Sequence, residues 1–318
     1  MRHMHSRPLL PQILLAFAGV YIIWGTTFLA LAITIRSIPP FISGAARFSI
    51  AATLMYAWLQ WREPRPFAGL KLGGSMLCGV LLSGIGNGFV VWSQESLPSG
   101  IAALFVGALP VTTLILDRLF FSKRTPSAQS VIGVTTGLAG IVVLSLNTLS
   151  LSAAVHPIHI VAVLTAGIAW SFGTLLQRRF VPSHRVQSFT CLQMLAGGLF
   201  QLAMSVIDQE WSGFQPSRIQ LQSVLAVLYL VVFGSLIAVN CYSFLVAHVS
   251  AQKVTTYALV NPVIALALGA IVLHERITPS AIVSTVLVLA GVGLVLFQRR
   301  PPQAAVVGPD LVSNAERN

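Results

Sequence analysis

Long apolar runs without a charged residue, separated by short polar segments, make up most of this chain. Six such runs, each at least 21 residues long, contain no Lys, Arg, Asp or Glu: 8–35, 72–94, 96–116, 186–207, 254–274 and 277–298. A helix of about 20 apolar residues crosses a bilayer core of about 30 Å. Each run is therefore predicted to form one transmembrane helix.

Four further helices come from longer or interrupted runs. Residues 125–177 carry no charge over 53 positions, too many for one crossing, and the polar segment 147–157 divides them into two helices. The run 219–252 predicts another helix, and residues 41–61 predict one that only Arg47 interrupts. The chain is thus expected to be an all-α integral membrane protein with ten transmembrane helices.

The second half of the sequence repeats features of the first half. Residues 21–26 (YIIWGT) resemble residues 167–172 (GIAWSF), and the sequence TPSA occurs at both 125–128 and 278–281, so matched positions lie 146 to 153 residues apart. Each half has five crossings, an odd number, so the second half is expected to be inverted relative to the first. Inverted repeats are a common framework of secondary transporters.

We therefore divide the chain into two five-helix repeats, residues 12–146 and 158–298. Residues 147–157 are the predicted connecting loop, and residues 1–11 a cytoplasmic N-terminus. The segment 299–318 is rich in small and polar residues, and it is expected to be a disordered cytoplasmic tail.

Basic residues gather on one side of the predicted membrane. Counting alternate loops from the N-terminus places fifteen Lys and Arg residues on one side and three, Arg36, Arg218 and Arg276, on the other. Cytoplasmic loops carry the excess of Lys and Arg in membrane proteins. Both termini are therefore predicted to be cytoplasmic.

Composition agrees with a membrane protein and argues against several other classes. Of the residues, 55% are hydrophobic and 8% are charged, whereas soluble domains carry about 25% charged residues. The net charge of +11 is scattered in short clusters between apolar runs, unlike the basic stripe of a nucleic-acid surface. The three cysteines are far apart, and the chain has no P-loop sequence. We expect no nucleic-acid partner, no bound metal or cofactor, and no ATP hydrolysis.

Several short motifs occur in a characteristic order. They are Trp24-Gly25-Thr26, Arg47-Phe48, Pro98 to Ala103, Asn261-Pro262 and Glu275. Over residues 12–298 the chain thereby resembles the EamA-like ten-helix exporters of the drug/metabolite transporter (DMT) superfamily. The resemblance implies a carrier of the bacterial inner membrane that exports amino acids or other metabolites without ATP. One departure is that Glu275 has no acidic counterpart after the fourth predicted helix, where Ser-Lys-Arg stands at 122–124.

Helix breakers and amides deep in the spans predict part of a substrate pathway. Pro110 and Pro262 lie mid-span in the two halves, and a proline removes one backbone hydrogen bond and disturbs the preceding turn. Interrupted helices in matching places of two repeats point to a binding site, although a kink that only improves packing is the alternative. Asn87, Asn240 and Asn261 offer amide donors and acceptors to a polar substrate, or to a neighbouring helix.

Aromatic residues predict the remaining walls of the pathway. Trp24 and Trp170 occupy the same place in each half, and Thr27 lies about one turn from Trp24 on the same helix face. Tyr257 and Trp92 complete the candidates. Aromatic walls around a few polar groups are typical of small-molecule pockets. The alternative for Trp24, Trp170, Thr27 and Tyr257 is packing in the core. For Trp92 the alternative is a place in an interfacial aromatic belt.

Two charged residues are candidates for a charge or coupling role. Arg47 is the one charge well inside a predicted span, where it could bind a substrate carboxylate, pair within the bundle or snorkel to the surface. Glu95, at the end of a span, is the best candidate for a titrating group. No Asp or Glu lies at the middle of a predicted span, which favours a facilitator, an exchanger or a proton step at a span end.

These features favour a secondary transporter that exports small metabolites by alternating access. The expected partners are a small-molecule substrate and the lipid bilayer, with the protein acting as a monomer or a homodimer. A membrane-embedded enzyme such as a lipid-group transferase is a second reading, but it generally needs clustered acids, a histidine pair or a metal set. A receptor or scaffold is a third, but it needs larger loops than the predicted ones of roughly 5–15 residues.

Overall fold

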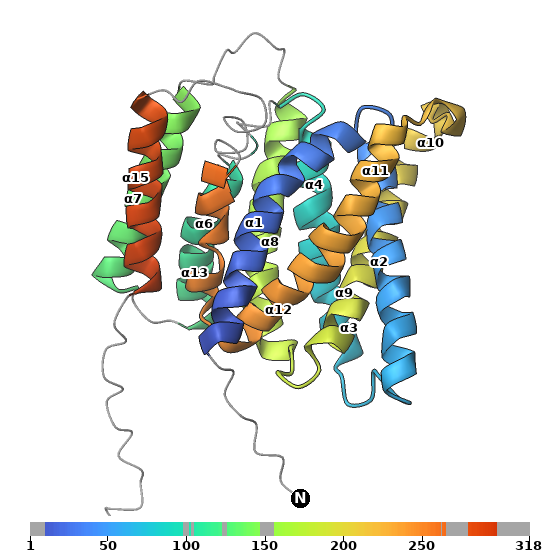
Figure 1. Ribbon diagram of the computed structural model, residues 1–318, viewed down its shortest axis with the longest axis horizontal. Helices are drawn as coiled ribbons and strands as arrows, with labels where there is room; N and C mark the ends of the chain where they lie inside the picture. Colours follow the sequence, from blue (N-terminus) through green and yellow to red (C-terminus); the bar gives the residue numbers. More distant parts are fainter. Residues whose placement is uncertain are drawn as a thin grey trace, which may run out of the picture.

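A computed structural model describes residues 10–97, 102, 105–122, 126–146, 156–261, 263–264 and 279–297 of the chain. Every regular element within these ranges is a helix, and the helices stand side by side in one bundle (Figure 1). The described part of the protein is thus all-helical.

The elements follow the order of the chain. The first half contains α1 (Leu10–Thr34), α2 (Pro40–Arg62), α3 (Leu72–Gly79), η1 (Val80–Gly86), α4 (Asn87–Ser93), α6 (Leu109–Leu116), η2 (Asp117–Phe121) and α7 (Ala128–Leu146). The second half contains α8 (Pro157–Phe180), α9 (Val186–Ile207), α10 (Glu210–Gly213), η3 (Pro216–Arg218), α11 (Leu221–Tyr229), η4 (Leu230–Ile237), α12 (Ala238–His248), α13 (Ala251–Val254) and α15 (Pro279–Leu296).

Five helices in the described part are long and apolar enough to cross a membrane. They are Leu10–Thr34, Leu72–Ser93, Pro157–Phe180, Val186–Ile207 and Leu221–His248, and each coincides with a segment predicted from the absence of charge. Helices α7 and α15 also lie within predicted segments, and α2 covers the predicted segment 41–61 with one more residue at each end. The predicted spans 96–116 and 254–274 are described only in part, and Pro262 and Glu275 lie outside the described residues.

Two of the long helices contain a widened turn of π-helical geometry. In the first half η1 joins α3 to α4, and in the second half η4 joins α11 to α12, so that Val80 and Leu230 begin equivalent segments. Such turns are rare and frequently occur at functional sites. Both segments turn small buried residues inward, Ser83 in η1 and Ser235 in η4.

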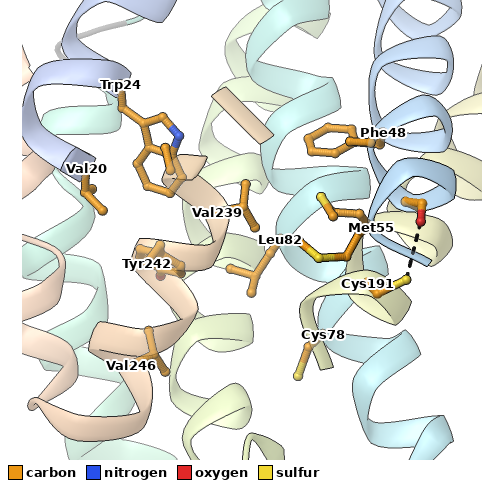
Figure 2. Packing of buried hydrophobic residues seen from close by; sticks show 14 of the residues in the cluster. Val20, Trp24, Phe48, Met55, Cys78, Leu82, Cys191, Val239, Tyr242 and Val246 are labelled. Carbon is orange, nitrogen blue, oxygen red and sulfur yellow. Dashed lines mark hydrogen bonds between the residues drawn. The ribbon is translucent and has the colours of Figure 1, made fainter. Parts of the chain in front are cut away.

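The hydrophobic core lies along the centre of the bundle, between helices of both halves. Val20 and Trp24 of α1 pack there beside Tyr242 and Val246 of α12, with Leu82 of η1 nearby (Figure 2). Large apolar side chains also cover the outside. On α1 the exposed residues Leu15, Ile22 and Leu29 follow one another at intervals of seven. A helix that is apolar all round suits lipid on its outer face.

The two ends of the bundle differ in charge. At one end, here the basic end, Arg185 Nη1 donates hydrogen bonds to the carbonyl oxygens of Ala68 (2.5 Å) and Pro66 (3.3 Å), so the loops 63–71 and 181–185 meet. At the other, here the acidic end, both carboxylate oxygens of Glu210 accept hydrogen bonds of 2.8 Å from the backbone amides of Phe41 and Ile42, at the start of α2. These contacts place the loops that leave α2 and α8 at one end, and the start of α2 at the other.

Helices α7 and α15 form a close pair at the edge of the bundle (Figure 1). A Cβ atom on Gly291 of α15 would lie 2.5 Å from the carbonyl oxygen of Gly133 and 2.6 Å from the amide nitrogen of Gly137, both on α7. Only glycine permits this approach. Small residues are what allow helix backbones to come together within a membrane.

Candidate substrate cavity

A cavity of about 750 Å³, which includes the part open to solvent, lies between helices of both halves. Its lining comes from α1, α2, η1, α4, α8, α9 and α12 and from the segments around 106–109 and 257–261. The lining residues used below are Trp24, Thr27, Arg47, Phe48, Asn87, Trp170, Gln193, Tyr242, Tyr257 and Asn261. The lining residues of α1 and α2 lie in the halves of these helices toward the acidic end, whereas Gln193 of α9 and Tyr242 of α12 lie toward the basic end, so the cavity lies near the middle of the bundle.

Four aromatic rings form one wall of the cavity. Trp24 is the centre of this aromatic cluster, with ring centroids 4.7 Å from Tyr257, 5.1 Å from Tyr242 and 5.5 Å from Trp170. Two of its contacts are edge-to-face, the arrangement that the quadrupole of an aromatic ring favours. On the side toward the basic end the cluster continues into the hydrophobic core (Figure 2). The cavity is therefore bounded on that side by packed side chains.

Hydrogen bonds fix the orientation of three of these rings. Trp24 Nε1 donates to the carbonyl oxygen of Gly234 at 3.3 Å, and Trp170 Nε1 donates to the hydroxyl of Tyr242 at 3.1 Å. The Tyr242 hydroxyl also shares a hydrogen bond with Thr174. With their polar atoms engaged, these rings present apolar surface to the cavity.

Arg47 supplies the positive charge of the cavity wall. It is 3% exposed, its Nε donates to Ser235 Oγ at 2.8 Å, and its guanidinium carbon lies 4.7 Å from the centroid of the Phe48 ring. Its Nη1 is buried and has no hydrogen-bond partner. Arg47 therefore lies inside the bundle, not at its surface, which contradicts the snorkelling alternative.

Amide side chains supply the neutral polar groups. The Oδ1 atoms of Asn87 and Asn261 are buried and have no hydrogen-bond partner. Gln193 also lines the cavity, and its Oε1 accepts a 3.5 Å contact from Ser243. Thr27 has its hydroxyl bonded to the carbonyl oxygen of Trp24 at 2.8 Å, so it is occupied within its own helix.

Seven of the residues predicted for the pathway or for a charge role thus line this one cavity: Trp24, Thr27, Arg47, Asn87, Trp170, Tyr257 and Asn261. Pro110 is buried beside it, in the first turn of α6, which begins directly after a turn at Ala108. The neighbouring Leu109 lines the cavity and accepts a hydrogen bond from Ser171 through its carbonyl oxygen (3.4 Å). Pro262 lies outside the described residues.

Asn240 lies outside the cavity lining. Its Nδ2 donates to the carbonyl oxygen of Leu236 on its own helix at 2.7 Å, and the residue borders a separate surface hollow that includes Trp58 and Gln187. Tyr242, two positions further along α12, faces the cavity instead. Neighbours two apart on a helix point to different faces, so Asn240 and Tyr242 lie on different sides of α12, and only Tyr242 lines this cavity.

Trp92 and Glu95 belong to a polar cluster at the acidic end. The ring centroid of Trp92 lies 4.9 Å from that of His159, whose Nε2 is 3.8 Å from Glu95 Oε2. Burial, and secondarily the charge of Asp208, raises the pKa of Glu95 above its usual range. Burial also raises the pKa of Glu210 to about 7, although its two backbone hydrogen bonds act in the opposite direction. The sequence analysis named Trp92 and Glu95 separately but did not predict this polar cluster, because Asp208 and Glu210 come from a different part of the sequence.

The helical bundle and its cavity define a membrane protein of the transporter type. Residues 11–146 and residues 157–297 each match the EamA-like transporter family. The chain therefore belongs to this family. The family assignment agrees with the resemblance seen in the short sequence motifs.

The chain is also similar to individual proteins and to a solved structure. The chain is 37% identical over 267 residues to the uncharacterized inner membrane transporter YedA of Escherichia coli strain K12, covering 84% of each protein. It is 22% identical over 263 residues to a probable amino-acid metabolite efflux pump of the same organism, covering 80% of this chain and 85% of that protein. A solved crystal structure, 20% identical, superposes with a TM-score of 0.71 over 91% of this chain and 96% of the other, and so shares the fold.

Proposed function

We propose that this protein is a secondary transporter that exports small metabolites, amino acids or related compounds, across the bacterial inner membrane by alternating access. The observation that carries the proposal is a mid-bundle cavity whose wall joins equivalent residues of both halves, Trp24 and Trp170. Small-molecule sites are mostly apolar with a few directed polar groups. The cavity fits that description through its aromatic cluster, its arginine and its amides.

The proposed topology has ten transmembrane helices in two inverted five-helix repeats, with both termini in the cytoplasm. In support, the structure joins loops 63–71 and 181–185 at the basic end, as an inverted arrangement requires. That end carries Arg62, Arg65, Lys71, Arg178, Arg179 and Arg185. The excess of basic residues supports the assignment of that end to the cytoplasm.

Alternating access would then separate the aromatic cluster. In this structure the aromatic cluster forms one wall of the cavity, and core residues such as Val246 pack behind it on the side toward the basic end. Rocking of one repeat against the other would break contacts such as that between Trp24 and Trp170 and expose the cavity to the cytoplasm. The aromatic cluster acts as the inner gate in this mechanism.

The chemistry of energy coupling is constrained by the lining. The described lining residues include no Asp or Glu, and buried acids are the usual carriers of a coupled proton. A proton step, if the cycle has one, would use the polar cluster of Glu95, Asp208 and Glu210 at the acidic end. Facilitated export or exchange, by a monomer or a homodimer, needs no such group.

Counterflow in proteoliposomes tests the proposal. Vesicles containing the purified protein and loaded with one unlabelled amino acid should accumulate the same labelled amino acid, for at least one member of a panel of the twenty. Trp170→Ala should reduce the initial rate at least about tenfold, because the cavity loses an aromatic wall. Ile168→Ala, whose side chain faces outward on the same helix, is the matched control.

The chemical class of the substrate can be identified first in cells. Overexpression should make bacteria resistant to one or more toxic amino acids or their analogues, and Trp170→Ala should remove that resistance at equal membrane abundance. Absence of counterflow with every compound of the panel, together with unchanged resistance, would reject the proposed export of amino acids.

A further inference from the structure

Arg47 holds a buried positive charge that the described part of the protein does not neutralise. It forms no ion pair with any described Asp or Glu. Its hydrogen bond goes to a neutral hydroxyl, that of Ser235, and a neutral ring, Phe48, lies beside the guanidinium group. Burying an ionised group without a counter-charge is costly, and this cost needs an explanation.

The fold holds the guanidinium group in place at this position. A Cβ on Gly234 would lie 2.9 Å from Arg47 Nη2, so η4 keeps a glycine where the guanidinium passes. Ser235, the next residue, accepts the hydrogen bond from Nε at 2.8 Å. The head group is thus clamped by η4 of the second half, while Nη1 is left without a partner in a residue that lines the cavity.

We propose that Arg47 is the specificity-determining residue of the cavity and that its free Nη1 binds a carboxylate of the substrate. This inference rests on the proposed transport function and adds a requirement for an anionic group. Arginine is the side chain best suited to bind a carboxylate, because its planar head presents several N–H donors around a permanent charge. A carboxylate would satisfy Nη1 and supply the missing counter-charge together.

Two further buried atoms complement the opposite part of such a substrate. Asn87 and Asn261 line the same cavity, and their buried Oδ1 atoms lack donors. An ammonium or hydroxyl group on the substrate would supply those donors. The cavity therefore presents an N–H donor with positive charge, two acceptors without charge and an aromatic wall, which together match a small carboxylate that also carries a donor group.

The test compares ligands that differ only in the carboxylate. Uptake into proteoliposomes of the wild type and of Arg47→Gln is measured with the twenty labelled amino acids, with their amides and with their decarboxylated amines. For transported acids, Arg47→Gln should raise KM about 10- to 100-fold, the range expected when a charge-assisted hydrogen bond is lost. For amides or amines that the wild type carries, the variant should change KM less than about threefold, since no ion pair is lost there. Arg47→Lys should fall between the two for the acids.

Each result bears on the proposal. A wild type with the same KM for amides or amines as for the acids, or an Arg47→Gln variant that impairs transport of acids and amides equally, would overturn the role of Arg47 and leave the transport function standing. A wild type that carries no compound of the panel would instead reject the transport function, and this inference with it. Melting temperatures of both variants, measured by size-exclusion chromatography after heating, identify a variant that has not folded. Ser235→Ala then serves as a second variant, expected to raise KM for acids less than Arg47→Gln does.

Discussion

The indole rings of Trp24 and Trp170 meet edge to face, with centroids 5.5 Å apart and planes inclined by 80°. The two residues occupy equivalent places in the two halves of the sequence, 146 positions apart. Their contact therefore joins one repeat to the other at the wall of the cavity. A packed pair in this position stabilises the present arrangement, and in the proposed alternating-access cycle it must break when the repeats move.

The first prediction concerns Trp24, the centre of the aromatic cluster. Replacing it with Ala removes the packing of three rings and the hydrogen bond to Gly234. Large-to-small changes of buried aromatic residues cost about 3–5 kcal/mol in protein cores. The Trp24→Ala variant should therefore lose its monodisperse chromatography peak at a distinctly lower temperature than the wild type.

Trp61→Ala is the control for this measurement, because Trp61 is 83% exposed on α2. It should melt within about one to two degrees of the wild type, since exposed substitutions usually change stability by less than about 0.5 kcal/mol. Equal destabilisation by the two variants would show that the aromatic cluster contributes little to stability.

Glu210 predicts a pH dependence of stability. Burial raises its pKa from 4.5 to about 7 in the folded protein, so the folded state binds the proton more tightly than the unfolded state does. The contribution of this group is fully present below about pH 4.5 and is lost as the pH rises through about 7. The melting temperature of the wild type should fall between pH 5 and pH 8.

Glu210→Gln removes this titration while keeping an acceptor for the amides of Phe41 or Ile42. Its melting temperature should change less across the same pH range. Some slope should persist, because burial also raises the pKa of Glu95 and Asp208. A wild type that becomes more stable toward pH 8, or a variant with an unaltered slope, would contradict the prediction.

The close contact of α7 with α15 predicts a contrast between two glycines of one helix. Gly291→Leu places side-chain atoms against the backbone of Gly133 and Gly137, where even a Cβ would come within 2.6 Å. A Cβ atom on Gly293 would meet nothing within 4 Å, so Gly293→Leu begins in open space. The first variant should be poorly recovered as folded protein in mild detergent, and the second should behave like the wild type. Comparable recovery of both would show that the two helices can separate without loss of the fold.

The sequence predicted the helices of the described part well, because lipid forbids unpaired backbone groups and a charge-free run of sufficient length has few alternatives to a helix. It also predicted that Trp24 and Trp170 would lie in one site, from their matching places in two repeats. It missed Gln193, although an amide within the apolar run 186–207 carries the same signal as Asn87.

The position of Asn240 depends on the register of the two repeats. Asn240 was matched to Asn87, 153 positions earlier, whereas the corresponding π-helical segments begin 150 positions apart, at Val80 and Leu230. Asn240 bonds to its own helix, and Tyr242 faces the cavity. The partnership of Arg47 with Ser235 was equally hidden, since it joins residues 188 positions apart, and no local pattern pairs them.

The last prediction concerns the two ends of the bundle. Arg185 binds the carbonyl oxygens of the loop that follows α2, so residues 68 and 183 should be reached from the same side of the membrane. Exposed Ser212 and Ser217 follow α9 and lie close in sequence to Glu210, which binds the start of α2 at the acidic end. These two positions should be reached from the opposite side.

Single cysteines at Ala68, Ser183, Ser212 and Ser217 are placed in a variant in which Cys78, Cys191 and Cys241 are replaced, since these three are the free cysteines of the chain. In intact cells a membrane-impermeant maleimide should label positions 212 and 217 and leave 68 and 183 unlabelled, because the proposed topology places the basic loops in the cytoplasm. Permeabilised cells provide the control, in which all four positions should react. Labelling of 68 and 183 from opposite sides would contradict the contact made by Arg185, and with it the inverted arrangement of the two repeats.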